Sequence, residues 1–180
     1  MAGTASDIVR VELRWALVMG ALVLLILGVI IYTAIDMGIS PPSNAETIDP
    51  KSLHKSGEFT EANLGTRVDP GGQITVRMIA TQFAFVPTCV KVPADRPVTL
   101  RVTSPDVLHG LLISGTNVNT MVVPGYVSQV HTVFRTTGDL VMPCHEFCGL
   151  GHSQMIATVR VVPAAEFHVD AQRRASCDPR

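Results

Sequence analysis

Charged residues are scarce in this chain of 180 residues: Asp, Glu, Lys and Arg make up 16% of it, against roughly 25% in an ordinary soluble domain. The formal net charge is −1, so the basic surplus typical of nucleic-acid-binding proteins is missing, and we expect no nucleic acid partner. Hydrophobic residues account for 47%, which excludes a disordered chain, because disorder needs low hydrophobicity and high charge. Four cysteines are too few for a small disulfide scaffold.

The missing charges leave one long apolar run near the N-terminus. No Asp, Glu, Lys or Arg occurs in residues 15–35, and a helix of this length spans about 30 Å, the thickness of a hydrocarbon core. Trp15 and Tyr32 lie near its ends, where aromatic side chains favour the membrane interface. We therefore predict a transmembrane helix over 15–35. A cleaved signal peptide is the alternative, but its apolar run is usually shorter and is followed by a cleavage site.

The positive-inside rule predicts the orientation of this helix. Arg10 and Arg14 precede it, whereas residues 36–50 contain no Lys or Arg. Residues 1–14 are therefore predicted to be cytoplasmic, and everything after the helix is predicted to lie outside the membrane, in the periplasm if the host is a bacterium. We thus expect a single-pass protein of a bacterial inner (plasma) membrane.

Alternating apolar and polar residues indicate a β domain in the second half of the chain. The segments 73–80 and 98–103 alternate as half-buried strands do. The pattern predicts an all-β sandwich or Greek-key barrel over 73–163. Residues 36–72 are predicted to form a connector that is partly ordered or packed on a partner, and 164–180 a C-terminal tail. Further β-rich runs, separated by Pro and Gly turns, are 108–113, 120–123, 127–135, 139–142 and 156–162.

The residues between the last two β-rich runs carry the chemistry of the chain. Residues 143–155 read P-C-H-E-F-C-G-L-G-H-S-Q-M, and His109 begins a strand far upstream. Soft sulfur ligands and imidazole favour copper, and His, Cys, His and a weak axial Met form a blue-copper site on a β-sandwich. A mononuclear site of this kind needs only one of the two cysteines.

The second cysteine extends the prediction to two metal ions. Cys144 and Cys148 on one loop can bridge two copper ions, each of which then has one imidazole and one weak axial donor. One electron shared between two ions changes each bond length little on transfer. Zinc bound by two cysteines and two histidines, or a disulfide between Cys144 and Cys148, are alternatives that the spacing leaves open. The complete predicted ligand set is His109, Cys144, Glu146 through its backbone carbonyl, Cys148, His152 and Met155.

The motif C-x₃-C-x₃-H-x₂-M, with Asp106-Val107-Leu108-His109 upstream, resembles the CuA site of subunit II of heme-copper oxidases such as cytochrome c oxidase. The stretches S-P-D-V-L-H-G, G-T-N-V-N and C-G-L-G-H are similar to the single-helix subunit II of ba-type, B-family oxidases. The resemblance implies a cupredoxin-like domain, a dinuclear copper CuA cofactor held by the ligands above, and the role of electron-entry subunit. It also implies two partners: a cytochrome c or similar donor, and a polytopic heme-bearing subunit I that reduces O₂ to water and pumps protons.

Four further residues are candidates for supporting roles. Phe83 and Phe85 match the stretch where the donor docks in the family and are predicted to contact it, with core packing as the alternative. Glu12 has the spacing of a Glu near the mouth of the family's proton path; an ordinary flanking charge is the alternative. Asp106 is expected to hold the His109 loop by hydrogen bonding, or to be an ordinary turn residue.

Two other functions fit the same residues. A nitric oxide reductase with a copper-bearing small subunit would differ only in the partner, where the reaction occurs. A free-standing, membrane-anchored copper protein that shuttles electrons or delivers copper would purify alone, whereas an oxidase subunit should co-purify with a polytopic heme protein. Cys89 and Cys177 can also pair, but sequence does not show their distance.

Overall fold

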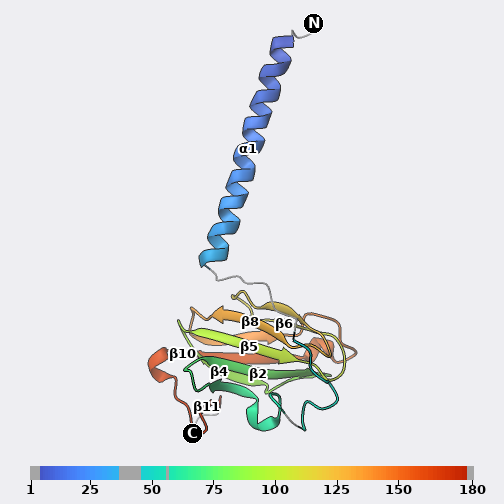
Figure 1. Ribbon diagram of the computed structural model, residues 1–180, viewed down its shortest axis with the longest axis vertical. Coiled ribbons are helices and arrows are strands. Elements are labelled where there is room, and N and C mark those ends of the chain that lie inside the picture. Colours follow the sequence, from blue (N-terminus) through green and yellow to red (C-terminus); the bar gives the residue numbers. More distant parts are fainter. Residues whose placement is uncertain (1–4, 37–45, 56, 178–180) are drawn as a thin grey trace. The chain divides into compact units, whose positions relative to one another are not determined.

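The computed structural model describes residues 5–36, 46–55 and 57–177, which form two units. Residues 1–4, 37–45, 56 and 178–180, which belong to the predicted N-terminal segment, connector and tail, lie outside the described residues. The first unit is the helix α1 (Ala5–Asp36), and the second is a β domain (Figure 1).

Helix α1 is the one described helix that is long and apolar enough to cross a membrane. Its apolar side chains, including Trp15 and Tyr32, are exposed, so no described protein segment buries them. An apolar surface of this extent is unfavourable in water, and it indicates a membrane-anchored protein. The helix begins well before the predicted span of 15–35 and therefore includes Glu12.

In the described residues, the β domain contains two packed sheets, a separate two-stranded hairpin sheet and three short 3₁₀ helices. Its 3₁₀ helices are η1 (Glu61–Asn63), η2 (His152–Gln154) and η3 (Ala164–Glu166). Its strands are β1 (Gly65–Val68), β2 (Ile74–Thr81), β3 (Ala84–Val86), β4 (Cys89–Pro93), β5 (Pro97–Thr103), β6 (His109–Leu112), β7 (Asn119–Val122), β8 (Ser128–Val133), β9 (Gly138–Pro143), β10 (Ile156–Val162) and β11 (Arg174–Ala175).

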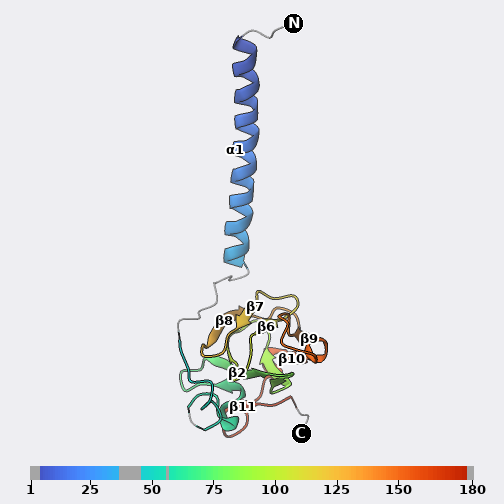
Figure 2. The same cartoon turned by 90° about the vertical axis from the view of Figure 1, so that its right-hand side faces the viewer.

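The larger sheet has the strand order β11-β1-β2-β5-β8, with β3 also paired to β2, and the smaller sheet has the order β4-β10-β9. β2 pairs with β5 in parallel, as β4 does with β10, whereas the other pairs are antiparallel. The hairpin of β6 and β7 contacts β9 and β8, so it connects the two packed sheets along one side (Figure 2). On the other side, β1 and β11 contact β4. This confirms the predicted all-β sandwich with one N-terminal apolar helix.

The core between the sheets is built from the alternation that the sequence shows. Val76 and Met78 of β2, and Leu100 and Val102 of β5, are at most 1% exposed. Burying one such side chain contributes about 1.5–3 kcal/mol, so this alternation is the main stabilising term for the sheet.

Residues 46–55 and 57–72, the described part of the predicted connector 36–72, carry structure of their own. Leu53 and Phe59 pack with Ile79 of β2 and with Val127 in a second, smaller hydrophobic cluster. Strand β1 extends the larger sheet beside β2. The described part of this segment is therefore packed onto the β domain.

An ion pair network holds the same segment. The Oε1 atom of Glu58 lies 2.8 Å from Nε of Arg77 and 2.6 Å from Nε of Arg101. Burial raises the pKa of the Glu58 carboxyl group, but hydrogen bonds from Arg101 and then Arg77 outweigh burial and lower the pKa overall. The ionised carboxylate thus links residues 46–72 to β2 and β5.

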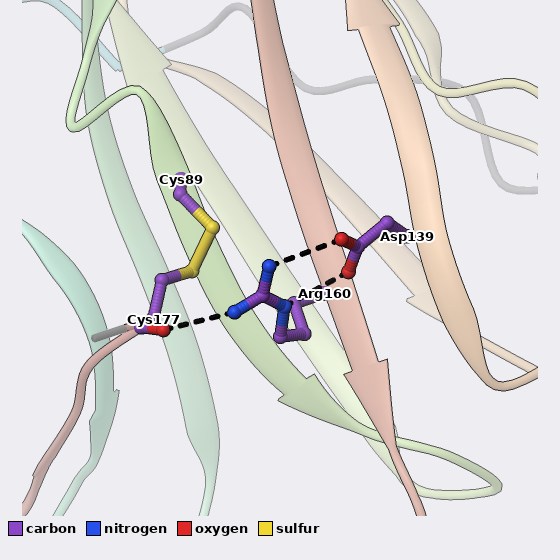
Figure 3. Close-up of a disulfide and its surroundings, with 4 residues drawn as sticks. All are labelled: Cys89, Asp139, Arg160 and Cys177. Atoms are coloured by element: carbon purple, nitrogen blue, oxygen red, sulfur yellow. Dashed lines mark hydrogen bonds and ion pairs between the residues drawn. A yellow bond between two sulfur atoms is a disulfide. The ribbon is translucent and has the colours of Figure 1, made fainter. Parts of the chain in front are cut away.

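The C-terminal segment also folds back onto the domain. Strand β11 pairs with β1, and Cys177 forms a disulfide with Cys89 at the start of β4 (Figure 3). Arg160 of β10 donates hydrogen bonds to the carboxylate of Asp139 on β9 and to the backbone carbonyl of Cys177. Residues 164–177 are therefore attached to both sheets.

Candidate metal centre

The loop between β9 and β10 carries five of the six predicted ligands. β9 ends at Pro143 and β10 begins at Ile156, and these two residues pair across the smaller sheet. The backbone N–H of Cys144 donates to the carbonyl of Met155 at 3.0 Å, just inside that pair. Both ends of the loop are therefore fixed to each other by the sheet.

The two sulfur atoms of the predicted site lie side by side, and each has an imidazole next to it. The Sγ atoms of Cys144 and Cys148 are 4.0 Å apart. Nδ1 of His109, at the start of β6, lies 4.0 Å from Sγ of Cys144. Nδ1 of His152, in η2, lies 3.6 Å from Sγ of Cys148.

The two weak donors divide between the sulfur atoms in the same way. The carbonyl oxygen of Glu146 lies 3.2 Å from Sγ of Cys144, and Sδ of Met155 lies 3.7 Å from Sγ of Cys148. Each sulfur atom is thus accompanied by one imidazole and one weak donor. The structure brings all six predicted ligand residues together, and three of them, His109, Cys144 and Cys148, place their ligand atoms within 4.8 Å of one another.

The burial of the site suits a soft metal ion. Cys144 and Cys148 are free thiols, 6% and 4% exposed, and His109 is fully buried. Burial, and then the neighbouring Cys144, raise the pKa of the Cys148 thiol to about 11. A thiolate therefore forms here readily only when a cation compensates its charge. Two soft sulfur ligands with imidazoles fit copper.

Asp106 determines which nitrogen of His109 faces the site. Its Oδ1 atom accepts a hydrogen bond from Nε2 of His109 at 2.9 Å, which leaves Nδ1 for a metal. Its Oδ2 atom accepts from the backbone N–H of Gln82 at 2.7 Å and from the hydroxyl of Thr81 at 2.9 Å. Partial burial raises the pKa of Asp106, but the hydrogen bonds from His109 and Gln82 outweigh it and hold the pKa well below its usual range.

The two phenylalanines of the predicted donor contact lie in different places. Phe83, in the turn between β2 and β3, is 40% exposed, and its ring packs on the metal loop. A Cβ atom added to Gly151 would lie 2.5 Å from Cγ of this ring, so the close packing depends on glycine. Phe85 of β3 is 0% exposed in the main core. The prediction that Phe85 contacts the donor is therefore wrong, and core packing is its role.

Three residues at the site were not predicted from the sequence. The side-chain Nε2 of Gln82 donates to the backbone carbonyl of Cys148 at 2.5 Å. Phe147 and Leu150, which lie between the ligands in the loop, are 77% and 100% exposed. Their positions between the ligands could have indicated this exposure, because a loop that directs its ligands inward turns the intervening side chains outward. Glu12 lies in the other unit, on α1.

The family model that matches this chain is the periplasmic domain of cytochrome c oxidase subunit II, over residues 72–162. A curated cytochrome c oxidase subunit 2 of Thermus thermophilus is 31% identical over 156 residues, which cover 86% of this chain and 93% of that protein. The chain belongs to the cytochrome c oxidase subunit II family. A second subunit 2 from Thermus thermophilus is 34% identical over 124 residues, or 69% of this chain and 92% of that protein.

Subunit II membership is also consistent with a solved structure of a heme-copper terminal oxidase dimer. One chain of that structure superposes with a TM-score of 0.62 and 29% sequence identity, covering 85% of this chain and 98% of that chain. The predicted family, the cupredoxin-like fold and the role as electron-entry part of an oxidoreductase complex are confirmed. The fold and the His/Cys/Cys cluster together indicate copper as the metal.

Gly151→Ala should disturb the metal loop, because the added Cβ atom would overlap the ring of Phe83. We expect a loss of about 1–3 kcal/mol in stability, typical of overpacking, together with reduced copper content in the purified full chain. Elemental analysis and thermal unfolding measure the two effects.

Gly71→Ala is the matched control, since nothing lies within 4 Å of its added Cβ atom. The double variant Gly151→Ala, Phe83→Ala should regain part of the copper, because the ring atoms at 2.5 and 2.6 Å are removed while Cβ of residue 83 stays 3.0 Å away. If Gly151→Ala alone keeps wild-type copper content and stability, the close packing of Phe83 on the loop is contradicted.

Proposed function

We propose that this subunit II holds a dinuclear copper centre and accepts electrons there on behalf of a heme-bearing partner. The paired arrangement of donors carries the proposal: each of two adjacent buried sulfur atoms has one imidazole and one weak donor beside it. The proposed ligands are His109, Cys144, Glu146 through its backbone carbonyl, Cys148, His152 and Met155.

The alternative metals use these donors less completely. A mononuclear blue-copper site needs one cysteine and would leave a second buried thiol 4.0 Å away without a ligand role. A Cys₂His₂ zinc site would leave the Met155 sulfur, 3.7 Å from Sγ of Cys148, unused. The dinuclear copper centre accounts for all six groups.

The chain's own residues keep this centre rigid. When bound, the copper pair supplies a one-electron carrier whose electron both ions share. Asp106 holds the ring of His109, and the pair of Pro143 and Ile156 holds the ends of the loop. Ligands fixed in this way move little when an electron arrives or leaves, which lowers the barrier to transfer.

The partners follow from the relatives. The solved relative belongs to a heme-copper terminal oxidase, so we propose that this chain assembles with a polytopic subunit I that reduces O₂ and pumps protons. The curated relatives are cytochrome c oxidase subunits, which favours a cytochrome c or similar donor, and O₂ over nitric oxide as the final acceptor. We further propose that α1 anchors the chain with its N-terminus in the cytoplasm and the copper domain in the periplasm.

The donor is proposed to dock on the exposed apolar side chains of the metal loop and its neighbour, Phe83, Phe147 and Leu150. A donor seated on them lies next to the loop that carries the sulfur ligands. Residues 73–163 contain six basic and four acidic residues, so strong charge steering of a basic cytochrome is not expected. A small, apolar and transient contact fits this surface.

Metal analysis with electron paramagnetic resonance (EPR) of the copper-loaded full chain in detergent tests the copper proposal. We expect two copper ions per chain and hyperfine structure from one electron shared by both nuclei. Met155→Leu should keep copper but alter the reduction potential, because the thioether of Met155 would bind copper only weakly and would mainly tune its potential. One copper ion per chain with hyperfine structure from a single nucleus, or a colourless zinc protein, would contradict the dinuclear centre.

Leu150→Ser should raise the KM for reduced cytochrome c several-fold in the assembled complex, because the most exposed apolar side chain of the docking surface is lost. The copper spectrum and kcat should stay unchanged. Val169→Ser, which alters an exposed apolar side chain of the C-terminal segment, is the control. Equal KM values for both variants and the wild type would place the docking surface elsewhere.

Glu12→Gln tests the proposal that Glu12 lies at the start of a proton path. Turnover of the assembled oxidase should slow while the copper spectrum stays intact, because a neutral amide does not relay protons. Asp7→Asn, which removes another acidic side chain from the same end of α1, should leave turnover unchanged. Wild-type turnover in Glu12→Gln would show that Glu12 is an ordinary flanking charge.

A further inference from the structure

We propose that Gln82 is a positioning residue of the electron relay, which ties the peptide group of Cys148 to the carboxylate that orients His109. The proposal rests on the copper centre proposed above and adds a residue that neither ligates metal nor contacts the donor in that account. Gln82 would keep two ligand residues from distant parts of the chain, His109 and Cys148, in one geometry.

The hydrogen bonds of Gln82 connect the two halves of the site. Gln82 lies in the turn between β2 and β3, and its side-chain Nε2 donates to the backbone carbonyl of Cys148 at 2.5 Å. Its backbone N–H donates to Oδ2 of Asp106 at 2.7 Å. The other oxygen of that carboxylate accepts from Nε2 of His109 at 2.9 Å. A continuous series of hydrogen bonds thus runs from the imidazole of one ligand to the peptide of another.

The residues on either side of Gln82 contact the same two parts of the site. The hydroxyl of Thr81 donates to Oδ2 of Asp106 at 2.9 Å, and the ring of Phe83 packs against Gly149 and Gly151. Residues 81–83 therefore connect two parts of the site. One is the turn that contains Asp106, whose carboxylate orients the ring of His109, and the other is the metal loop.

The backbone that follows Cys148 lies close to the side chain of Gln82. Gly149 has φ +129°, a region that favours glycine, and a Cβ atom there would lie 3.1 Å from Nε2 of Gln82. The turn at Gly149 and the hydrogen bond from Gln82 thus act on the same peptide. Because this peptide directly follows Cys148, which would supply a sulfur ligand, its orientation would affect both that ligand and the local electrostatic potential.

The amide of Gln82 also has an electrostatic effect. An N–H group directed at the Cys148 carbonyl places positive potential close to the sulfur ligands, which favours the reduced, less positive state of the centre. Removing the donor should therefore lower the midpoint potential, and a negative charge at the same position should lower it further.

The test uses the full chain in detergent, loaded with copper, with Gln82→Met and Gln82→Glu. Methionine has a similar length but no donor, so we expect a lower midpoint potential, altered EPR hyperfine structure, and copper loss to a chelator faster by a factor of about five, as for one lost hydrogen bond. Gln82→Glu should lower the potential more. The control, Gln73→Met, removes an exposed amide at the edge of β2 and should match the wild type.

A Gln82→Met variant with wild-type potential and EPR spectrum would overturn the inference. Lower thermal stability with an unchanged potential and spectrum would overturn it too, since it would show a purely structural role. The EPR spectrum of the wild type distinguishes a failure of the proposed role of Gln82 from a failure of the proposed copper centre. If the wild type lacks the dinuclear signal, both fail; if it has the signal and Gln82→Met matches it, only the role of Gln82 fails.

Discussion

Two cysteine thiols 4.0 Å apart in a buried site are the constraint on which the rest of this structure depends. Burial disfavours the ionised form of Cys148, so its thiolate is stable beside a cation, and the site supplies donors to that cation from both sides. The loop provides one imidazole, and β6 provides the other. The contact of the β6–β7 hairpin with β9 brings His109 to the loop, so the contact that closes one side of the sandwich also completes the site.

The site separates buried ligands from an exposed apolar surface within one short loop. Cys144 and Cys148 face the core, whereas Phe147 and Leu150 face outward. The same loop therefore combines buried sulfur ligands with apolar side chains that are exposed on the surface of the domain. The smaller sheet anchors both ends of the loop, and the disulfide between Cys89 and Cys177 attaches the C-terminal segment to the same sheet. An electron relay needs this rigidity more than it needs a substrate cavity.

The sequence predicts the parts of this fold that local patterns encode. β2 and β5 alternate clearly, and ligand spacing identifies the metal loop. Short strands such as β4 (Cys89–Pro93) have too few residues for an alternation of apolar and polar side chains to be recognised. Whether such a segment forms a strand is determined by its pairing with other strands. Phe83 and Phe85 would share a face in a continuous strand, but Phe83 lies in a turn before β3, so only one is exposed. The hydrogen bond from Gln82 joins residues 66 positions apart, and no local signal reveals it.

Rapid mixing of the purified oxidase complex containing this chain with reduced cytochrome c, under anaerobic conditions, tests the central claim most directly. We predict that copper absorption changes first, that reduction of the partner's heme follows, and that Cys148→Ser abolishes both signals. Reduction of the heme at the wild-type rate in the Cys148→Ser complex would contradict the account, because electrons would then enter the oxidase without passing through this chain.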